Sequence, residues 1–158
     1  MFTKIAWATD GSELADATLP LVTELAGTHG TKLVAIHVNT LFRGGKFGGG
    51  PVLADEEELA QKIRGQVDDL RAAGFEVELE FVASDRSDTA ALIAELAMRA
   101  GADLIVVGTH GKSAAAGLLN PSVASGLLHH APCAVLAQPP LERLIVPEAL
   151  PLLASAVV

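Results

Sequence analysis

Short blocks of apolar residues alternate along the chain with segments in which apolar residues recur every three or four positions. The continuous blocks predict strands buried on both faces of a sheet, and the wider spacing predicts amphipathic helices. The predicted strands cover residues 4–8, 33–38, 75–82, 104–107 and 133–137, and the predicted helices cover residues 13–26, 51–73, 89–100 and 121–130. This alternation predicts a three-layer α/β fold, a doubly wound parallel sheet with helices on both faces.

Three features modify this pattern. The block over 75–82 (FEVELEFV) alternates apolar residues with glutamates, which predicts a half-exposed strand at a sheet edge. Pro20 lies within the first predicted helix and predicts a kink there, because proline lacks the N–H that an interior helical position donates. His37 lies in the second strand with no cysteine, histidine or aspartate at metal-ligand spacing, so we interpret it as a hydrogen-bonded core or sheet-edge residue.

Composition narrows the class of protein. A chain of 158 residues that is 50% hydrophobic can form one domain with a sizeable core. A net charge of −8 argues against nucleic-acid partners and against attraction to anionic membranes. No apolar segment reaches the roughly 20 residues that span a bilayer. Cys133 is the single cysteine and is predicted to be a small buried residue, and the absence of a secretory signal makes the cytoplasm the expected location.

The candidate chemistry begins where the strand over 104–107 ends. Gly108 stops the apolar block, Gly111 follows three residues later, and Asn120-Pro121 opens the next predicted helix. Glycines at a strand end allow a tight turn and a close approach to a ligand, and the first N–H groups of a helix favour an anion. Strand, glycine turn and helix N-terminus together predict an anion site.

This glycine turn is not a nucleotide-binding P-loop. The string at residues 111–113 (GKS) matches the end of that motif, but the motif requires a glycine where this chain has Val106. In doubly wound folds, ligands instead bind beyond the carboxyl ends of the strands, where the strand order reverses. If the first and fourth strands are neighbours, Asp10 and Gly108 face one crevice.

Three segments of the chain resemble the universal stress protein family: residues 8–12 (ATDGS), 102–111 (ADLIVVGTHG) and 130–135 (HAPCAV). The resemblance extends over residues 2–137. It implies a five-stranded parallel sheet with strand order 3-2-1-4-5, which commonly forms a homodimer, and a role in stress survival. Family members divide into those that bind ATP and those that do not.

The resemblance also implies a nucleotide motif, in which two glycines three positions apart are followed, after nine residues, by a glycine and a serine or threonine. Gly108, Gly111 and Ser122 fit this motif, but Pro121 replaces the third glycine. Loss of that backbone N–H would weaken binding by roughly tenfold to a hundredfold. Two functions therefore stay open: binding of ATP or another adenine nucleotide as a regulatory ligand, with or without Mg²⁺, and a nucleotide-free dimeric interaction module.

Site residues follow from the resemblance position by position. Asp10 would lie near the ribose and phosphates, the main chain of Val38 would meet the adenine, and Ser122 would bind a phosphate oxygen. The complete implied set is Ala8, Thr9, Asp10, Val38, Gly108, His110, Gly111, Ser122 and Val123. For Thr9 and Asp10 the alternative is helix capping alone, and for His110 it is a solvated loop residue.

An enzyme is not expected, although slow ATP hydrolysis stays open. The sequence offers no nucleophile paired with a base and no cluster of metal ligands, so we predict neither catalytic residues nor a metal site. Phosphoryl transfer also needs positive charge around the phosphates, for which only Lys46, in a glycine-rich loop, and Lys112 are candidates.

The chain is predicted to divide into an α/β domain over residues 1–138 and a C-terminal extension over 139–158. The pair Pro139-Pro140 interrupts regular structure at this boundary. The last nine residues are too apolar to lie alone in water. We expect the extension to pack on its own domain or on a second copy of the chain.

Overall fold

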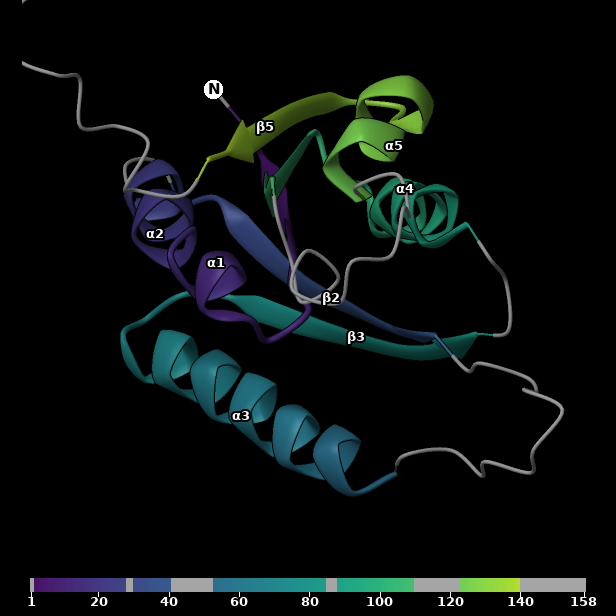
Figure 1. Cartoon of the computed structure of the whole chain (residues 1–158). Helices are drawn as coiled ribbons and strands as arrows, with labels where there is room; N and C mark the ends of the chain where they lie inside the picture. The colour runs from purple at the N-terminus through teal and green to yellow at the C-terminus, as the bar shows by residue number, and fades with distance from the viewer. Residues whose placement is uncertain (1, 28–29, 41–52, 85–87, 110–122, 140–158) are drawn as a thin grey trace, which may run out of the picture.

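The computed structural model describes residues 2–27, 30–40, 53–84, 88–109 and 123–139 (Figure 1). Its strands are β1 (Lys4–Ala8), β2 (Lys32–Thr40), β3 (Val77–Ser84), β4 (Leu104–Gly108) and β5 (Ala134–Gln138). Its helices are α1 (Glu13–Asp16), α2 (Leu19–Gly27), α3 (Leu53–Ala72), α4 (Thr89–Ala100) and α5 (Val123–His130). Each predicted strand is present, and two short helices stand where one helix over 13–26 was predicted.

The described strands form one parallel sheet of five strands in the order β3-β2-β1-β4-β5. β1 lies at its centre, paired with β2 on one side and β4 on the other. The predicted fold class and strand order are therefore confirmed. β3 occupies one edge, as its alternating pattern predicted, with Glu78 and Glu80 exposed and Val77 buried.

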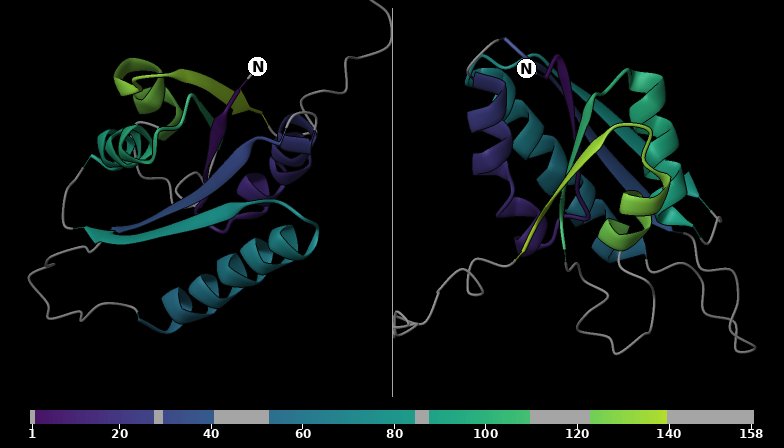
Figure 2. Two further views of the ribbon diagram at one scale, coloured as in Figure 1. Left: turned by 180° about the vertical axis from the view of Figure 1, so that it is seen from behind. Right: turned by 90° about the horizontal axis from the view of Figure 1, so that it is seen from above.

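Helices cover both faces of the sheet, with α1, α2 and α3 on one side and α4 and α5 on the other (Figure 2). Neighbouring strand residues point to opposite faces, so β1 contributes to two cores. The α2–α3 cluster includes Ile5, Trp7, Val22, Leu33, Val67, Leu70 and Val106. The α4–α5 cluster includes Ala6, Ala8, Ile36, Ile93, Leu96, Ile105, Val107 and Leu127.

The helical structure is interrupted between α1 and α2, so these residues do not form one kinked helix. α1 ends at Asp16, α2 begins at Leu19, and the buried Thr18 between them donates its hydroxyl to the Ala15 carbonyl at 2.7 Å. The break places Pro20 in the first turn of α2, where a backbone N–H has no intrahelical acceptor. Pro20 therefore fits the first turn of α2 at little cost in stability.

Cys133 is half-buried rather than fully buried, and it packs against the α4–α5 cluster. Burial raises the pKa of its thiol, with a smaller contribution from the negative charge of Asp103. A thiol with a raised pKa is mostly protonated near neutral pH and is therefore a weak nucleophile. Cys133 is therefore an unreactive side chain that packs against the core, as predicted, but it is not fully buried.

Asp103 joins the beginnings of β4 and β1. Its carboxylate accepts hydrogen bonds from the Thr3 amide at 2.8 Å, the Thr3 hydroxyl at 2.8 Å and the Lys4 amide at 3.1 Å. Desolvation opposes the charge, but these hydrogen bonds outweigh it and hold the pKa of Asp103 below its ordinary value of 3.8. The ionised carboxylate therefore stabilises the fold.

We expect Asp103→Asn to lower the free energy of unfolding at pH 7 by about 1 kcal/mol, a value reduced for partial solvent exposure. Because the native pKa is depressed, the contribution of Asp103 is complete above its unfolded pKa and is lost as the pH falls through the native value. The difference between wild type and variant should shrink below about pH 4. Urea unfolding over this pH range checks it, and a pH-independent difference contradicts it.

Candidate functional site

β1 and β4 meet at the point where the sheet reverses its winding. Ala8 pairs with Val107, so the two strands end side by side. β1 leads into α1, which covers the face of the sheet toward which Trp7 points. β4 is followed in the chain by α5, which covers the opposite face, toward which Ala8 points. The adjacency predicted for the first and fourth strands is confirmed, and such a switch point is where doubly wound sheets bind ligands.

Thr9 is held by the protein on every polar group. Its amide donates to the Ile36 carbonyl at 3.0 Å, its hydroxyl accepts from the Gly11 amide at 3.1 Å, and its carbonyl lies 2.9 Å from His37 Nδ1. Thr9 is only 5% exposed. Its position therefore fixes the path of the chain into Asp10.

Asp10 lies at the start of a tight turn and is partly buried. Its Oδ1 accepts from the Ser12 amide at 3.0 Å. Ser12 is the N-cap of α1, and its Oγ accepts from the Ala15 amide at 3.2 Å. The predicted turn and capping roles are thus confirmed, and the turn holds the Asp10 carboxylate at the carboxyl edge of the sheet.

Two side chains of α3 hold α1 and this turn from the other side. Lys62 Nζ donates to the Gly11 carbonyl at 2.7 Å and to Asp16 Oδ2 at 2.5 Å. Gln66 Nε2 donates to Asp16 Oδ1 at 2.8 Å. These contacts place one positive charge close to the turn that carries Asp10.

Gly108 has a close neighbour within the protein. A Cβ on Gly108 would lie 3.1 Å from the Leu14 carbonyl oxygen, which belongs to the backbone of α1. The next residue, Thr109, donates its amide to the Gln138 carbonyl at 2.9 Å. The sequence predicted that this glycine serves a tight turn and a ligand, and the described structure adds that the backbone of α1 packs closely against it.

Three further predicted residues lie on the side of the sheet that α4 and α5 cover. The side chain of Ala8 belongs to the α4–α5 cluster, and the half-buried Val38 and Val123 pack against it. Val38 lies near the end of β2, and Val123 begins α5. His110, Gly111 and Ser122 lie outside the described residues, as do Pro121, both candidate lysines and the extension beyond residue 139.

The family of the chain follows from its sequence. The model of the universal stress protein family matches residues 1–139. The chain belongs to this family. A comparison with curated proteins finds no match.

Solved structures of universal stress proteins share the fold. A protein of this family from Burkholderia pseudomallei is 29% identical, with a TM-score of 0.64 over 87% of this chain and 96% of that one. A universal stress protein in complex with cAMP is 23% identical, with a TM-score of 0.61 over 87% and 97%. One from Archaeoglobus fulgidus in complex with dAMP is 21% identical, with a TM-score of 0.60 over 87% and 97%.

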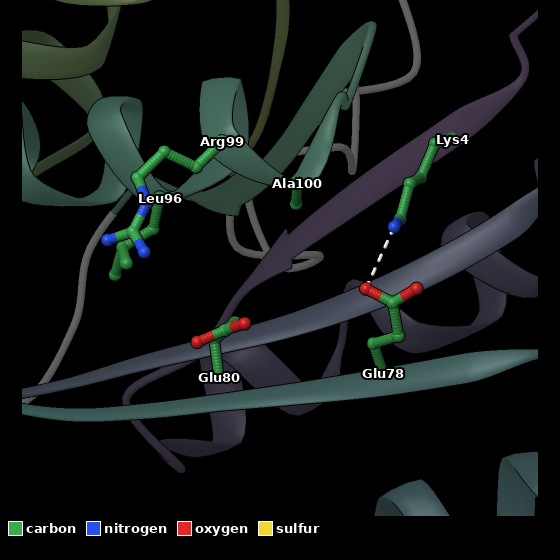
Figure 3. Close-up of a pocket in the computed structure, with 6 residues that line it drawn as sticks. All are labelled: Lys4, Glu78, Glu80, Leu96, Arg99 and Ala100. Atoms are coloured by element: carbon green, nitrogen blue, oxygen red, sulfur yellow. Dashed lines mark hydrogen bonds and ion pairs between the residues drawn. The ribbon is translucent and has the colours of Figure 1, made fainter.

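A charged pocket lies away from the carboxyl edge in this universal stress protein. It has a volume of about 280 Å³ and is lined by Lys4, Glu78, Glu80, Leu96, Arg99 and Ala100 (Figure 3). Lys4 Nζ and Glu78 Oε2 form an ion pair of 2.8 Å across it. Lys4 begins β1 whereas Asp10 follows its end, so this pocket is separate from the residues that the family resemblance indicates.

Two residues that contact the turn at Asp10 were not predicted to do so. His37 was interpreted as a core residue, which its 3% exposure confirms, but its contact with Thr9 was not foreseen. The sequence did not single out Lys62, because a lysine on an amphipathic helix is normally interpreted as a solvent-exposed residue. Across the described ranges, no three potential ligands lie together to hold a metal ion, and no helix there is long and apolar enough to cross a membrane.

Proposed function

We propose that this chain binds an adenine nucleotide, ATP or AMP, as a regulatory ligand at the carboxyl edge of the sheet. The observation that carries this proposal is the pairing of β1 with β4, from which the chain leads to helices on opposite faces. Asp10 and Gly108 thereby lie at the same edge. Family members in complex with cAMP and dAMP support the choice of an adenine nucleotide.

The described residues suit different parts of the ligand. The Asp10 carboxylate is an acceptor that ribose hydroxyls can donate to. β2 continues to Thr40, past the Ile36–Ala8 pair, so the main chain of Val38 extends beyond the end of β1 on that side. A main-chain edge of this kind can hydrogen-bond to the adenine ring.

We place the phosphates between Gly108, at the end of β4, and the N-terminus of α5. α5 begins at Val123, and the N-terminus of a helix favours an anion. The nucleotide acts here as a ligand and not as a substrate, and Mg²⁺ enters with the phosphates of ATP. The family resemblance supports a cytoplasmic homodimer with a role in stress survival as the working form.

Isothermal titration calorimetry with ATP and with AMP, each with and without Mg²⁺, tests this function. We expect saturable binding to the wild type and a loss of about tenfold or more in affinity for Asp10→Ala, because the variant loses charge-assisted hydrogen bonds to the ribose. Asp69→Ala is the matched control, since it removes an exposed carboxylate from α3. The absence of both heat and thermal shift at millimolar nucleotide contradicts the proposal.

A further inference from the structure

The chain before and after Asp10 is anchored at two carbonyl groups by side chains from distant elements. The Thr9 carbonyl, which precedes Asp10, lies 2.9 Å from Nδ1 of His37 on β2. The Gly11 carbonyl, in the peptide group between Gly11 and Ser12, accepts from Nζ of Lys62 on α3 at 2.7 Å. The peptide group that precedes Asp10 is therefore fixed directly, and a second anchor lies one residue beyond Asp10.

The contact to Thr9 assigns the proton on the His37 ring. A carbonyl oxygen only accepts, so the Nδ1 of His37 carries a proton and donates it. The ring is 3% exposed, and its centroid lies 4.6 Å from that of Phe81 at a tilt of 41°. Arg64 covers the ring of Phe81 at 5.6 Å. Neighbouring side chains thus hold the donor in a single orientation.

We propose that His37 is a positioning residue for the adenine-nucleotide site, an inference that rests on the proposed function. The Thr9 carbonyl belongs to the planar peptide group that ends at the nitrogen of Asp10. Fixing that plane restricts the backbone dihedrals on either side of it and so sets the direction in which the Asp10 side chain leaves the chain. His37 itself is buried and acts on the ligand through Asp10.

Two substitutions separate this role from simple packing. His37→Leu fills much of the ring volume but cannot donate, whereas His37→Asn carries an amide N–H close to the position of Nδ1. We expect His37→Leu to weaken nucleotide binding about tenfold and His37→Asn to recover most of that loss, although both lose ring packing. In an Asp10→Ala background, His37→Leu should have no further effect on affinity, because the two residues act in series.

Lys62, which anchors the Gly11 carbonyl from the protein surface, can be replaced without disturbing the core. Lys62 is 42% exposed in its side chain, and Lys62→Met keeps the aliphatic stem without the donor. We expect a loss of about threefold in nucleotide affinity, smaller than for His37→Leu, because water can replace an exposed donor.

Spectra of the unliganded protein test the positioning directly. We expect the imidazole ¹⁵N spectrum to show a protonated Nδ1, and His37→Leu, but not His37→Asn, to shift the amide resonances of Asp10 and Gly11 and speed their hydrogen exchange. Failure of the wild type to bind ATP or AMP overturns the proposed function, and these spectra then judge the positioning alone. Unchanged Asp10 and Gly11 amides in His37→Leu, wild-type affinity in that variant, or a loss that persists in the Asp10→Ala background overturns the role of His37.

Discussion

Replacing Trp7 with alanine is expected to lower the free energy of unfolding by about 3–5 kcal/mol, the range for removing a large aromatic side chain from a core. Trp7 is the single tryptophan of the chain, it is 1% exposed, and it lies in the α2–α3 cluster. Its indole N–H donates to Thr18 Oγ1 at 2.9 Å and lies 3.4 Å from the Ala15 carbonyl. The substitution therefore removes both a core side chain and the hydrogen bond that ties the α1–α2 junction to β1.

Urea unfolding followed by far-ultraviolet circular dichroism measures this effect without the tryptophan signal. For a chain of this size, the loss corresponds to a fall in melting temperature of about 6–20 °C. Met98→Ala is the matched control, because Met98 is a large apolar residue that is 57% exposed, and its removal should change stability by about 0.5 kcal/mol or less. A Trp7→Ala variant within about 1 kcal/mol of the wild type contradicts the packing described here.

A second substitution at Trp7 separates the indole hydrogen bond from the ring. Trp7→Phe keeps most of the aromatic volume and removes the N–H. We expect it to cost about 1–2 kcal/mol more in the wild type than in a Thr18→Val background, where the nearer acceptor is already gone and only the Ala15 carbonyl at 3.4 Å is left. The same cycle tests whether α1, and with it the turn at Asp10, depends on β1 through this contact.

The fold was predictable because each element carries its own periodic signal. The block over 104–107 predicted a strand buried on both faces, and the alternation of FEVELEFV predicted an edge strand, and both are confirmed. Strand bounds moved by about two residues, so that β2 runs to Thr40 and β3 to Ser84. Apolar patterns record where side chains are buried, whereas a strand ends where its hydrogen bonding ends, and this explains the difference.

The contacts that shape the candidate site were not predictable in the same way. His37 and Thr9 are 28 residues apart, and Lys62 and Gly11 are 51 residues apart, so neither contact leaves a periodic trace. Gly108 was interpreted as serving a tight turn and a ligand, and its contact with α1 was missed because the sequence does not show that the Leu14 carbonyl oxygen lies 3.1 Å from its missing Cβ. The family resemblance indicated the candidate site residues, and only the structure showed which side chains contact them.

Gly11→Ala is expected to be the next most damaging change, at about 2–5 kcal/mol, because two costs add. Gly11 has a φ of +67°, a conformation that costs a residue with a Cβ about 1–2 kcal/mol. A Cβ at this position would also lie 1.9 Å from Leu59 Cδ1 on α3. Overfilling a packed site typically costs about 1–3 kcal/mol. Urea unfolding gives the sum of the two costs.

Gly30→Ala separates these two costs. Gly30 has a φ of +65°, and nothing lies within 4 Å of its missing Cβ, so this variant carries the backbone cost alone. The difference between the variants measures the clash with Leu59, and adding Leu59→Ala to Gly11→Ala should recover that part without removing the backbone strain. If Gly11→Ala costs no more than Gly30→Ala, Leu59 rotates freely and α3 does not press on the turn. In that case Lys62 alone would join α3 to the peptide group that follows Gly11, and Gly11→Ala should leave nucleotide affinity unchanged.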